Sequence, residues 1–118
     1  MDKTQLLETI VKAADDKRAE DIVALDMEGV SLLADYFVIM NGNSERQVQA
    51  IVDGVEDAVE AFGGNQPRIE GKKGSRWMLM DFNDIVVHVF VPEEREFYNL
   101  EKLWSDAPLV DVQQWVTD

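Results

Sequence analysis

Residues 76–91 read RWMLMDFNDIVVHVFV and carry the clearest indication of how the chain folds. Apolar, aromatic and β-branched residues fill both halves of this stretch, a composition that is typical of strands. Between the halves, the pair Asn83-Asp84 supplies residue types that form tight turns. Residues 76–82 and 85–91 are therefore predicted to pair as an antiparallel hairpin.

Upstream of the hairpin, the chain predicts two helices and three strands. Apolar residues recur at helical spacing over residues 4–17 and 44–62, which indicates two amphipathic helices. Residues 21–27 and 35–40 are short and mostly apolar, as buried strands are, and a short edge strand is expected at 68–70.

The residues after the hairpin predict one helix, over 93–104, followed by a tail. The expected fold class is therefore α/β (α+β-like), a single domain over residues 1–107 with a mixed five-stranded sheet flanked by helices. Residues 108–118 are expected to form a loosely held C-terminal tail. The apolar residues that could dock part of it are Val110, Val112, Trp115 and Val116.

The composition is that of a strongly acidic globular protein without cysteine. Of its 118 residues, 24 are acidic and 11 are basic, so the formal net charge is −13. Such a surface repels phosphates and anionic lipid and attracts basic partners, although the charge could serve solubility alone. The absence of cysteine excludes disulfides and thiolate chemistry. Neither a membrane-spanning apolar run nor a secretion signal is present, so a cytoplasmic location is expected.

The candidate catalytic groups do not have the spacing that catalysis needs. Asp81 and Asp84 flank the predicted turn, but Asn83 stands where a second carboxylate would be needed to hold Mg²⁺. We therefore expect a surface hydrogen bond or ion pair for Asp81 and a turn-forming role for Asp84. His88, the only histidine, has no nucleophile motif beside it and is expected to be packed or partner-facing. The sequence predicts neither an enzyme nor a metal or cofactor site.

Large aromatic side chains are concentrated between residues 77 and 104. Six of them fall within these 28 residues: Trp77, Phe82, Phe90, Phe97, Tyr98 and Trp104. Aromatic residues bordered by charged ones are typical of binding hot spots. Any one ring could instead fill the core. Six are more than the core is expected to take, because a hairpin and a short helix each offer it one face.

At these residues the chain resembles a known family. The segments that carry the resemblance are Trp77–Asp81, Asp84–Phe90, Glu94-Arg95 and Phe97–Trp104, with earlier matches at Asp21–Asp26, Asp35–Ile39 and Gly42–Ser44. They are similar to the ribosome silencing factor family, also called the Iojap or RsfS family, over about residues 6–107. One departure is Asn83, where the family usually has glycine, but asparagine also accepts turn conformations.

The resemblance implies a nucleotidyltransferase-like fold without the catalytic carboxylates. It also implies a ribosomal silencing factor, which binds the large ribosomal subunit via large-subunit ribosomal protein number fourteen. Occupying the face that meets the small subunit would sterically block subunit joining and repress translation, especially under nutrient limitation. The alternatives left open are a large-subunit assembly factor and, from a different class, a Mg²⁺-dependent nucleotidyltransferase.

The docking face for this function is expected on the hairpin and the helix that follows it. The candidate partner-binding residues are Trp77, Leu79, Asp81, His88, Phe90, Arg95, Tyr98, Leu100 and Trp104. Which of them touch the partner and which fill the core is left open. A basic loop with Lys72, Lys73 and Arg76 leaves open a minor contact with rRNA. The expected assembly state is a monomer or weak homodimer, with no membrane partner.

Overall fold

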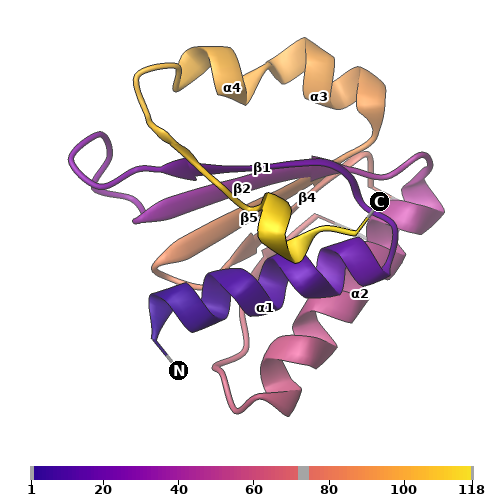
Figure 1. The fold of residues 1–118 in the computed structure, drawn as a ribbon. Helices are drawn as coiled ribbons and strands as arrows, with labels where there is room; N and C mark the ends of the chain where they lie inside the picture. Colours follow the sequence, from indigo (N-terminus) through magenta and orange to yellow (C-terminus); the bar gives the residue numbers. More distant parts are fainter. Residues whose placement is uncertain (1, 72–74, 118) are drawn as a thin grey trace.

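The computed structural model describes residues 2–71 and 75–117 and has a six-stranded sheet between two layers of helices (Figure 1). The elements in chain order are α1 (Lys3–Asp16), β1 (Glu20–Asp26), β2 (Tyr36–Asn41), α2 (Glu45–Ala61), β3 (Arg68–Glu70), β4 (Trp77–Asp81), β5 (Ile85–Phe90), α3 (Pro92–Tyr98), α4 (Leu100–Leu103), β6 (Leu109–Val110) and the 3₁₀ helix η1 (Gln113–Trp115). The strand order is β3-β4-β5-β2-β1-β6. The pair β2–β5 is parallel and the other pairs are antiparallel, so the sheet is mixed, as predicted.

Strand β5 lies inside the sheet and is buried along its whole length. It pairs with β4 on one side and with β2 on the other. Successive side chains point to opposite faces, so Ile85, Val87 and Val89 pack with α1 and α2. Val86 and Phe90 pack with residues of α4 and the segment after it. Burial on both faces explains why this strand is a continuous apolar run.

Helices α1 and α2 form one layer and confirm the two predicted amphipathic helices (Figure 1). Each begins at a capping side chain. Asp2 accepts from the Gln5 N–H at 2.8 Å, and the Ser44 hydroxyl accepts from the Gln47 N–H at 3.1 Å. Among the described residues, no helix is both long and apolar enough to span a membrane.

The predicted hairpin of β4 and β5 is confirmed. Its register pairs are Trp77 with Phe90, Leu79 with His88 and Asp81 with Val86. The turn uses Asn83 in the left-handed region, with a φ of 78°, which asparagine tolerates better than most residues. The Asp81 carboxylate accepts from the Asn83 N–H at 2.8 Å and so stabilises the turn.

The prediction of one continuous helix over residues 93–104 was wrong, because Asn99 divides it into α3 and α4. Asn99 has a φ of 45°, in the left-handed conformation that ends helices. Its N–H still donates to the Arg95 carbonyl at 2.9 Å and closes the last turn of α3. Asparagine adopts this conformation at lower cost than most residues, but an asparagine inside a helical pattern does not by itself indicate a break.

The prediction of five strands was also wrong, because residues 109–110 add a sixth. Strand β6 pairs with β1, and the Asp26 N–H donates to the Pro108 carbonyl at 2.8 Å. This pairing satisfies backbone groups along the edge of β1 that would otherwise stay open. A strand of two residues has no measurable alternation, so sequence periodicity could not indicate it.

Beyond β6 the chain crosses to the other layer, where η1 lies against α1 (yellow in Figure 1). Val112 is buried in the larger core, and Trp115 packs partly buried against that core. Thr117 donates from its N–H and its hydroxyl to the Asp15 carboxylate, at 3.1 and 2.8 Å. These contacts favour a C-terminal segment that is anchored to the domain over the loosely held tail that was expected. How stably it is held in solution stays a prediction.

We predict that Val112→Ala lowers the free energy of unfolding by about 1–3 kcal/mol, because it deletes buried methyl groups and leaves a cavity. Urea unfolding followed by circular dichroism measures this change. Leu109→Ala is the matched control, since Leu109 belongs to the same segment but is exposed, and we expect a change below about 0.5 kcal/mol. Near-zero effects of both variants would show that the segment is not anchored.

Candidate docking surface

Helices α3 and α4 partly cover one face of the sheet (Figure 1). A row of aromatic side chains lies on that face. Trp77 is central to it. Its ring stacks on Phe90 with 4.9 Å between centroids and lies 4.6 Å from the ring of Tyr98. Its indole Nε1–H donates to His88 Nδ1 at 3.3 Å. Ring pairs at these distances contribute favourably beyond simple burial, so the row stabilises the hairpin and fixes Trp77 in place.

His88 is the buried polar member of this row. It is 5% exposed, and its ring lies 5.1 Å from that of Phe37. Because Nδ1 accepts from Trp77, the proton of the neutral imidazole is on Nε2, which has no hydrogen-bond partner among the described residues. Burial lowers the pKa of His88 from 6.5 to about 4, so the ring is neutral at pH 7. His88 is therefore a packed residue that orients the Trp77 indole.

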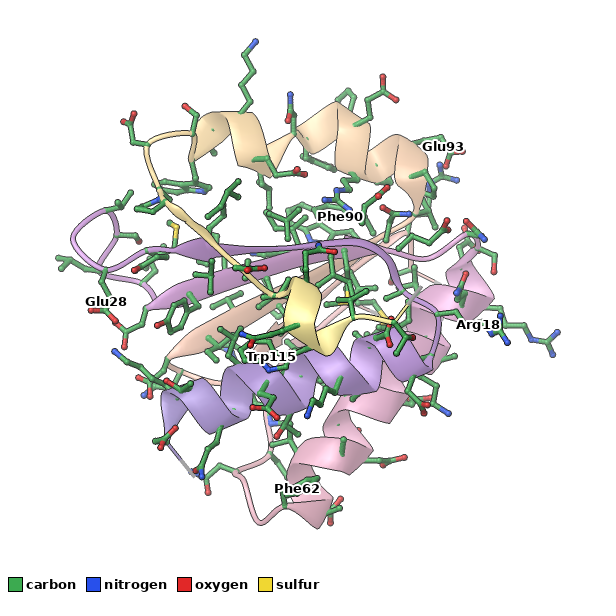
Figure 2. The ribbon with its side chains drawn as sticks, in the orientation of Figure 1. Arg18, Glu28, Phe62, Phe90, Glu93 and Trp115 are labelled. Carbon is green, nitrogen blue, oxygen red and sulfur yellow. The ribbon has the colours of Figure 1, made fainter. Side chains whose placement is uncertain are left out.

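Two of the nine candidate docking residues, His88 and Phe90, are thus core residues. Figure 2 shows Phe90 between the sheet and α3. Leu100 and Trp104, at the two ends of α4, help to close this second core, with Trp104 edge-on to Phe37 at 6.0 Å. A strand with neighbours on both sides and helices on both faces has no free surface. In this structure His88 and Phe90 are therefore placed in the core and not on the surface.

Arg95 braces the helices and is not free for docking. Its side chain is largely buried, with Nη1 donating to Asn41 Oδ1 at 2.8 Å and Nε donating to Glu101 Oε1 at 2.9 Å. The first bond reaches the end of β2, and the second reaches α4. One guanidinium therefore ties both helices to the sheet with charge-assisted hydrogen bonds.

The surface that stays open to solvent lies around β4. Only β3, the three-residue edge strand, lies beyond β4 on that side of the sheet. Trp77 and Leu79 are half-buried there, and Tyr98 of α3 is 44% exposed. Phe97 is 78% exposed and meets Tyr98 edge-on at 5.1 Å. We call these four residues the docking surface. Grouped aromatic and apolar side chains open to solvent are typical of protein interfaces.

Phe97 is the member of the docking surface that the candidate set lacked. The available signal was the adjacent pair Phe97-Tyr98 within a predicted helix. Neighbouring positions on a helix are about 100° apart, so two large rings cannot both face the sheet. One of them therefore has to point outward.

Charged residues around the docking surface are paired with one another. Arg68 lies 3.2 Å from the Asp81 carboxylate, which confirms the predicted ion pair and counts against a metal-binding role for Asp81. Arg76 lies 3.1 Å from the carboxylate of Glu94 in α3. An rRNA contact through Arg76 stays a prediction. Lys72 and Lys73 lie outside the described residues.

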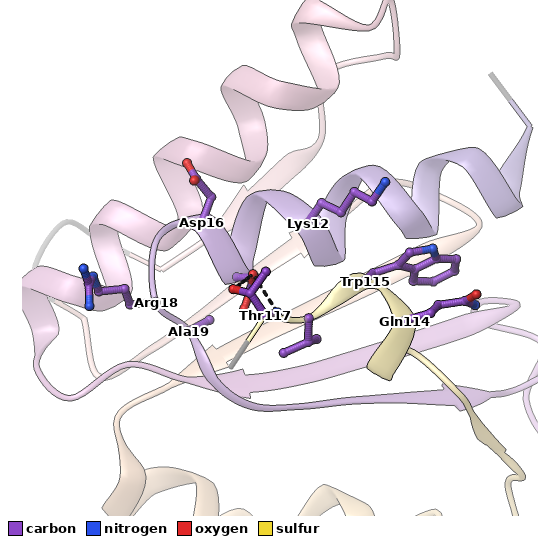
Figure 3. A pocket seen from close by; sticks show the side chains of 9 residues that line it. Lys12, Asp16, Arg18, Ala19, Gln114, Trp115 and Thr117 are labelled. Carbon is purple, nitrogen blue, oxygen red and sulfur yellow. Dashed lines mark hydrogen bonds between the residues drawn. The ribbon is translucent and has the colours of Figure 1, made fainter.

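A hollow away from the docking surface lies between the end of α1 and the C-terminal segment (Figure 3). It is lined by residues that include Asp16, Arg18 and Trp115. Asp15 also lines it, and its carboxylate already accepts two hydrogen bonds from Thr117. Within residues 2–71 and 75–117, no three Asp, Glu or His side chains converge as ligands of a metal ion would.

Burial of His88 makes stability depend on pH in a defined direction. In the unfolded chain the imidazole takes up a proton below its ordinary pKa of 6.5, whereas the folded chain keeps it neutral down to about pH 4. Acid therefore favours unfolding between these values, by up to about 1.4 kcal/mol per pH unit. We predict that between pH 7.5 and 5 the wild-type chain loses about 2 kcal/mol more stability than His88→Asn.

Asparagine does not titrate in this range and keeps an acceptor near the position of Nδ1 for the Trp77 indole. Denaturant unfolding of both proteins at several pH values measures the difference, because their surface carboxylates are the same. Parallel pH profiles would contradict a neutral, buried His88.

Comparison with known proteins assigns the chain to a family. The family model described as "Ribosomal silencing factor during starvation" matches residues 1–118. A Bacillus subtilis protein named "Ribosomal silencing factor RsfS" is 54% identical over 112 residues, with 95% of each chain covered. A crystal structure from Bacillus halodurans matches with a TM-score of 0.81 and 48% identity, covering 93% of this chain and 100% of that one.

A crystal structure from Chromobacterium violaceum matches with a TM-score of 0.85 and 30% identity, covering 89% of this chain and 88% of that one. The fold and the identity with these relatives agree. Over residues 1–118 the chain belongs to the ribosomal silencing factor family, also called RsfS or Iojap, which is a family of silencing factors and not of enzymes.

Proposed function

We propose that this chain binds the large ribosomal subunit via large-subunit ribosomal protein number fourteen, at the face that meets the small subunit. Occupying that face sterically blocks subunit joining and represses translation, especially under nutrient limitation. The observation that carries the proposal is the match of residues 1–118 to the silencing-factor family. A cytoplasmic location follows from this role, because bacterial subunits join in the cytoplasm.

The charge of the chain supports a basic protein as the direct partner. The formal net charge is −13, and the two arginines beside the docking surface, Arg68 and Arg76, are paired with carboxylates. Such a surface is drawn to basic proteins and repelled by a phosphate backbone, which favours a ribosomal protein over rRNA. The same charge opposes self-association, so we expect a monomer or at most a weak homodimer.

The aromatic members of the docking surface supply most of the binding energy in this proposal. Trp77 is held before binding by its hydrogen bond to His88 and its stacking on Phe90. Tyr98 is held against Trp77 in turn. Side chains that are already ordered lose little entropy when a partner covers them, which favours affinity. Silencing by occupancy needs no turnover and therefore no catalytic group.

We predict that Tyr98→Ala weakens binding to purified large subunits by about tenfold to a hundredfold, as truncation of a central interface aromatic typically does. Phe62→Ala is the matched control. It removes an exposed ring at the end of α2, in the layer opposite α3 and α4 (Figure 2), and we expect wild-type binding. Co-sedimentation with large subunits measures binding, and sucrose gradients after addition of small subunits measure joining.

Two results would contradict silencing. One is a wild-type chain that fails to bind large subunits, and the other is binding that leaves subunit joining unchanged. The assembly-factor alternative predicts a different pattern, in which precursor large subunits accumulate in cells that lack the chain while joining in vitro is unaffected by it.

A further inference from the structure

A loop at one end of the sheet carries solvent-exposed leucine side chains. Residues 27–35 connect β1 to β2, and within them Leu32 is fully exposed and Leu33 is 74% exposed. Val30 is also on the exposed side of the same loop. Single exposed apolar residues are ordinary, but adjacent ones grouped on one loop are a feature of interaction sites.

Hydrogen bonds hold the tip of this loop in one conformation. The Met27 carbonyl accepts from the N–H groups of Val30 and Ser31, both at 3.0 Å. The Ser31 hydroxyl oxygen accepts from the Leu33 N–H at 3.1 Å. Met27 is itself buried in the second core and fixes the start of the loop. The backbone that carries the leucines is therefore held by hydrogen bonds, which lowers the entropic cost of binding through this loop.

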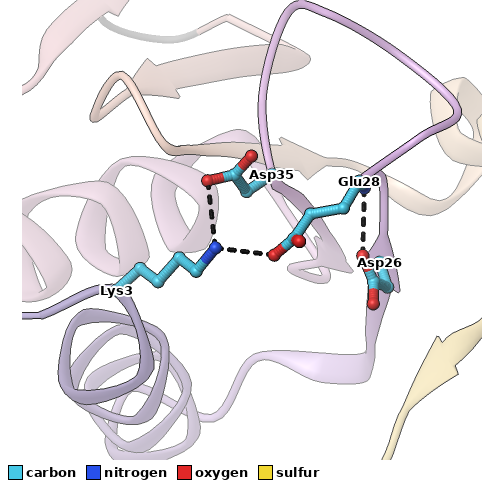
Figure 4. A network of polar contacts seen from close by, with 4 residues as sticks. All are labelled: Lys3, Asp26, Glu28 and Asp35. Carbon is cyan, nitrogen blue, oxygen red and sulfur yellow. Dashed lines mark hydrogen bonds and ion pairs between the residues drawn. The ribbon is translucent and has the colours of Figure 1, made fainter.

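An ion-pair network holds the base of the loop (Figure 4). Lys3 of α1 lies 2.6 Å from the Glu28 carboxylate and 3.3 Å from that of Asp35. The hydrogen bonds to Glu28 and Asp35 raise the pKa of Lys3, so the bridge stays charged through the neutral range. Both ends of the loop are thus tied to α1, and its tip points into solvent.

The loop adjoins the turn that follows β4, the strand of the docking surface. The N–H groups of Asp35 and Tyr36 donate to the Asp84 carbonyl at 2.8 and 3.1 Å. The loop and this turn together line one hollow, and Asp84 is one of its lining residues. Within the part of the chain that the structure describes, Asp84 has no ion-pair partner. An apolar tip and an available carboxylate therefore lie at one end of the hairpin, and Trp77 of the docking surface lies at its other end.

We propose that Leu32 and Leu33 are a second anchor on the large subunit, which inserts into an apolar recess of a basic protein. The inference rests on the proposed function and extends its contact along the hairpin, from Trp77 to the turn at Asp84. The Asp84 carboxylate pairs with a lysine or arginine of that protein. Leucine cannot stack on bases and the acidic residues that line the hollow repel phosphate, which disfavours nucleic acid and anionic membrane. A second copy of the chain brings a like charge of −13.

The test compares variants of the full chain in binding to purified large subunits. The double variant Leu32→Ser with Leu33→Ser is expected to weaken binding by about tenfold to a hundredfold, because it removes two apolar side chains from the interface. Phe62→Ser is the matched control, since it replaces an exposed apolar side chain at the end of α2, in the layer opposite α3 and α4 (Figure 2). It is expected to bind like the wild type, and thermal unfolding verifies that all variants are folded.

Salt dependence tests the charged part of the same anchor. Asp84→Asn is expected to weaken binding at low ionic strength and to have little effect at high ionic strength, where exposed ion pairs are screened. An Asp84→Asn variant that binds like the wild type at low ionic strength would remove the ion pair from the proposal.

The inference and the proposed function fail in different ways. If the double leucine variant binds like the wild type while Tyr98→Ala binds weakly, the second anchor is wrong and the docking surface stands. If the wild type does not bind large subunits, both are wrong. Two further results would overturn the inference. If sedimentation velocity shows a wild-type homodimer that the double variant does not form, the leucines bind a second copy of the chain. If anionic vesicles pellet the wild type but not the double variant, the leucines bind a membrane.

Discussion

Burial of β5 on both faces is the constraint on which the rest of the structure depends. The strand pairs with β2 and β4, and all six of its residues are removed from water. Three of them need the cover of α1 and α2, and the other three need the cover of the segment that contains α3 and α4. His88 makes the second requirement harder to meet, because a buried imidazole needs hydrogen-bond partners. Trp77 supplies one of them, at Nδ1.

The docking surface is a consequence of that arrangement. The inner part of the aromatic row, His88 and Phe90, belongs to the core, whereas Trp77 and Tyr98 reach the solvent. The core residues fix the orientation of the residues that a partner would meet, so stability and recognition are coupled through Trp77. The opposite layer has an acidic outer face on α2, which repels phosphates from that side of the molecule.

Sequence reasoning succeeded where a signal extends over many residues, as in the two amphipathic helices and the hairpin. It failed where one or two residues decide the structure, as at Asn99 and in β6. The site was predicted as a region, the hairpin and the helix after it, from its group of aromatic residues. The alternation of side chains along β5 could not show that a later helix covers the sheet face on which His88 and Phe90 lie. The exposed Leu32 and Leu33 were not predicted, because two adjacent leucines in a sequence look the same in a core and on a loop.

Hydroxyl-radical footprinting of the free chain and of its complex with purified large subunits measures most directly which face meets the ribosome. Binding through the docking surface predicts slower oxidation of Phe97 and Tyr98 in the complex, with Phe62 in the α1–α2 layer oxidised at the same rate in both states. Protection of Phe62, with unchanged oxidation of Phe97 and Tyr98, would contradict it.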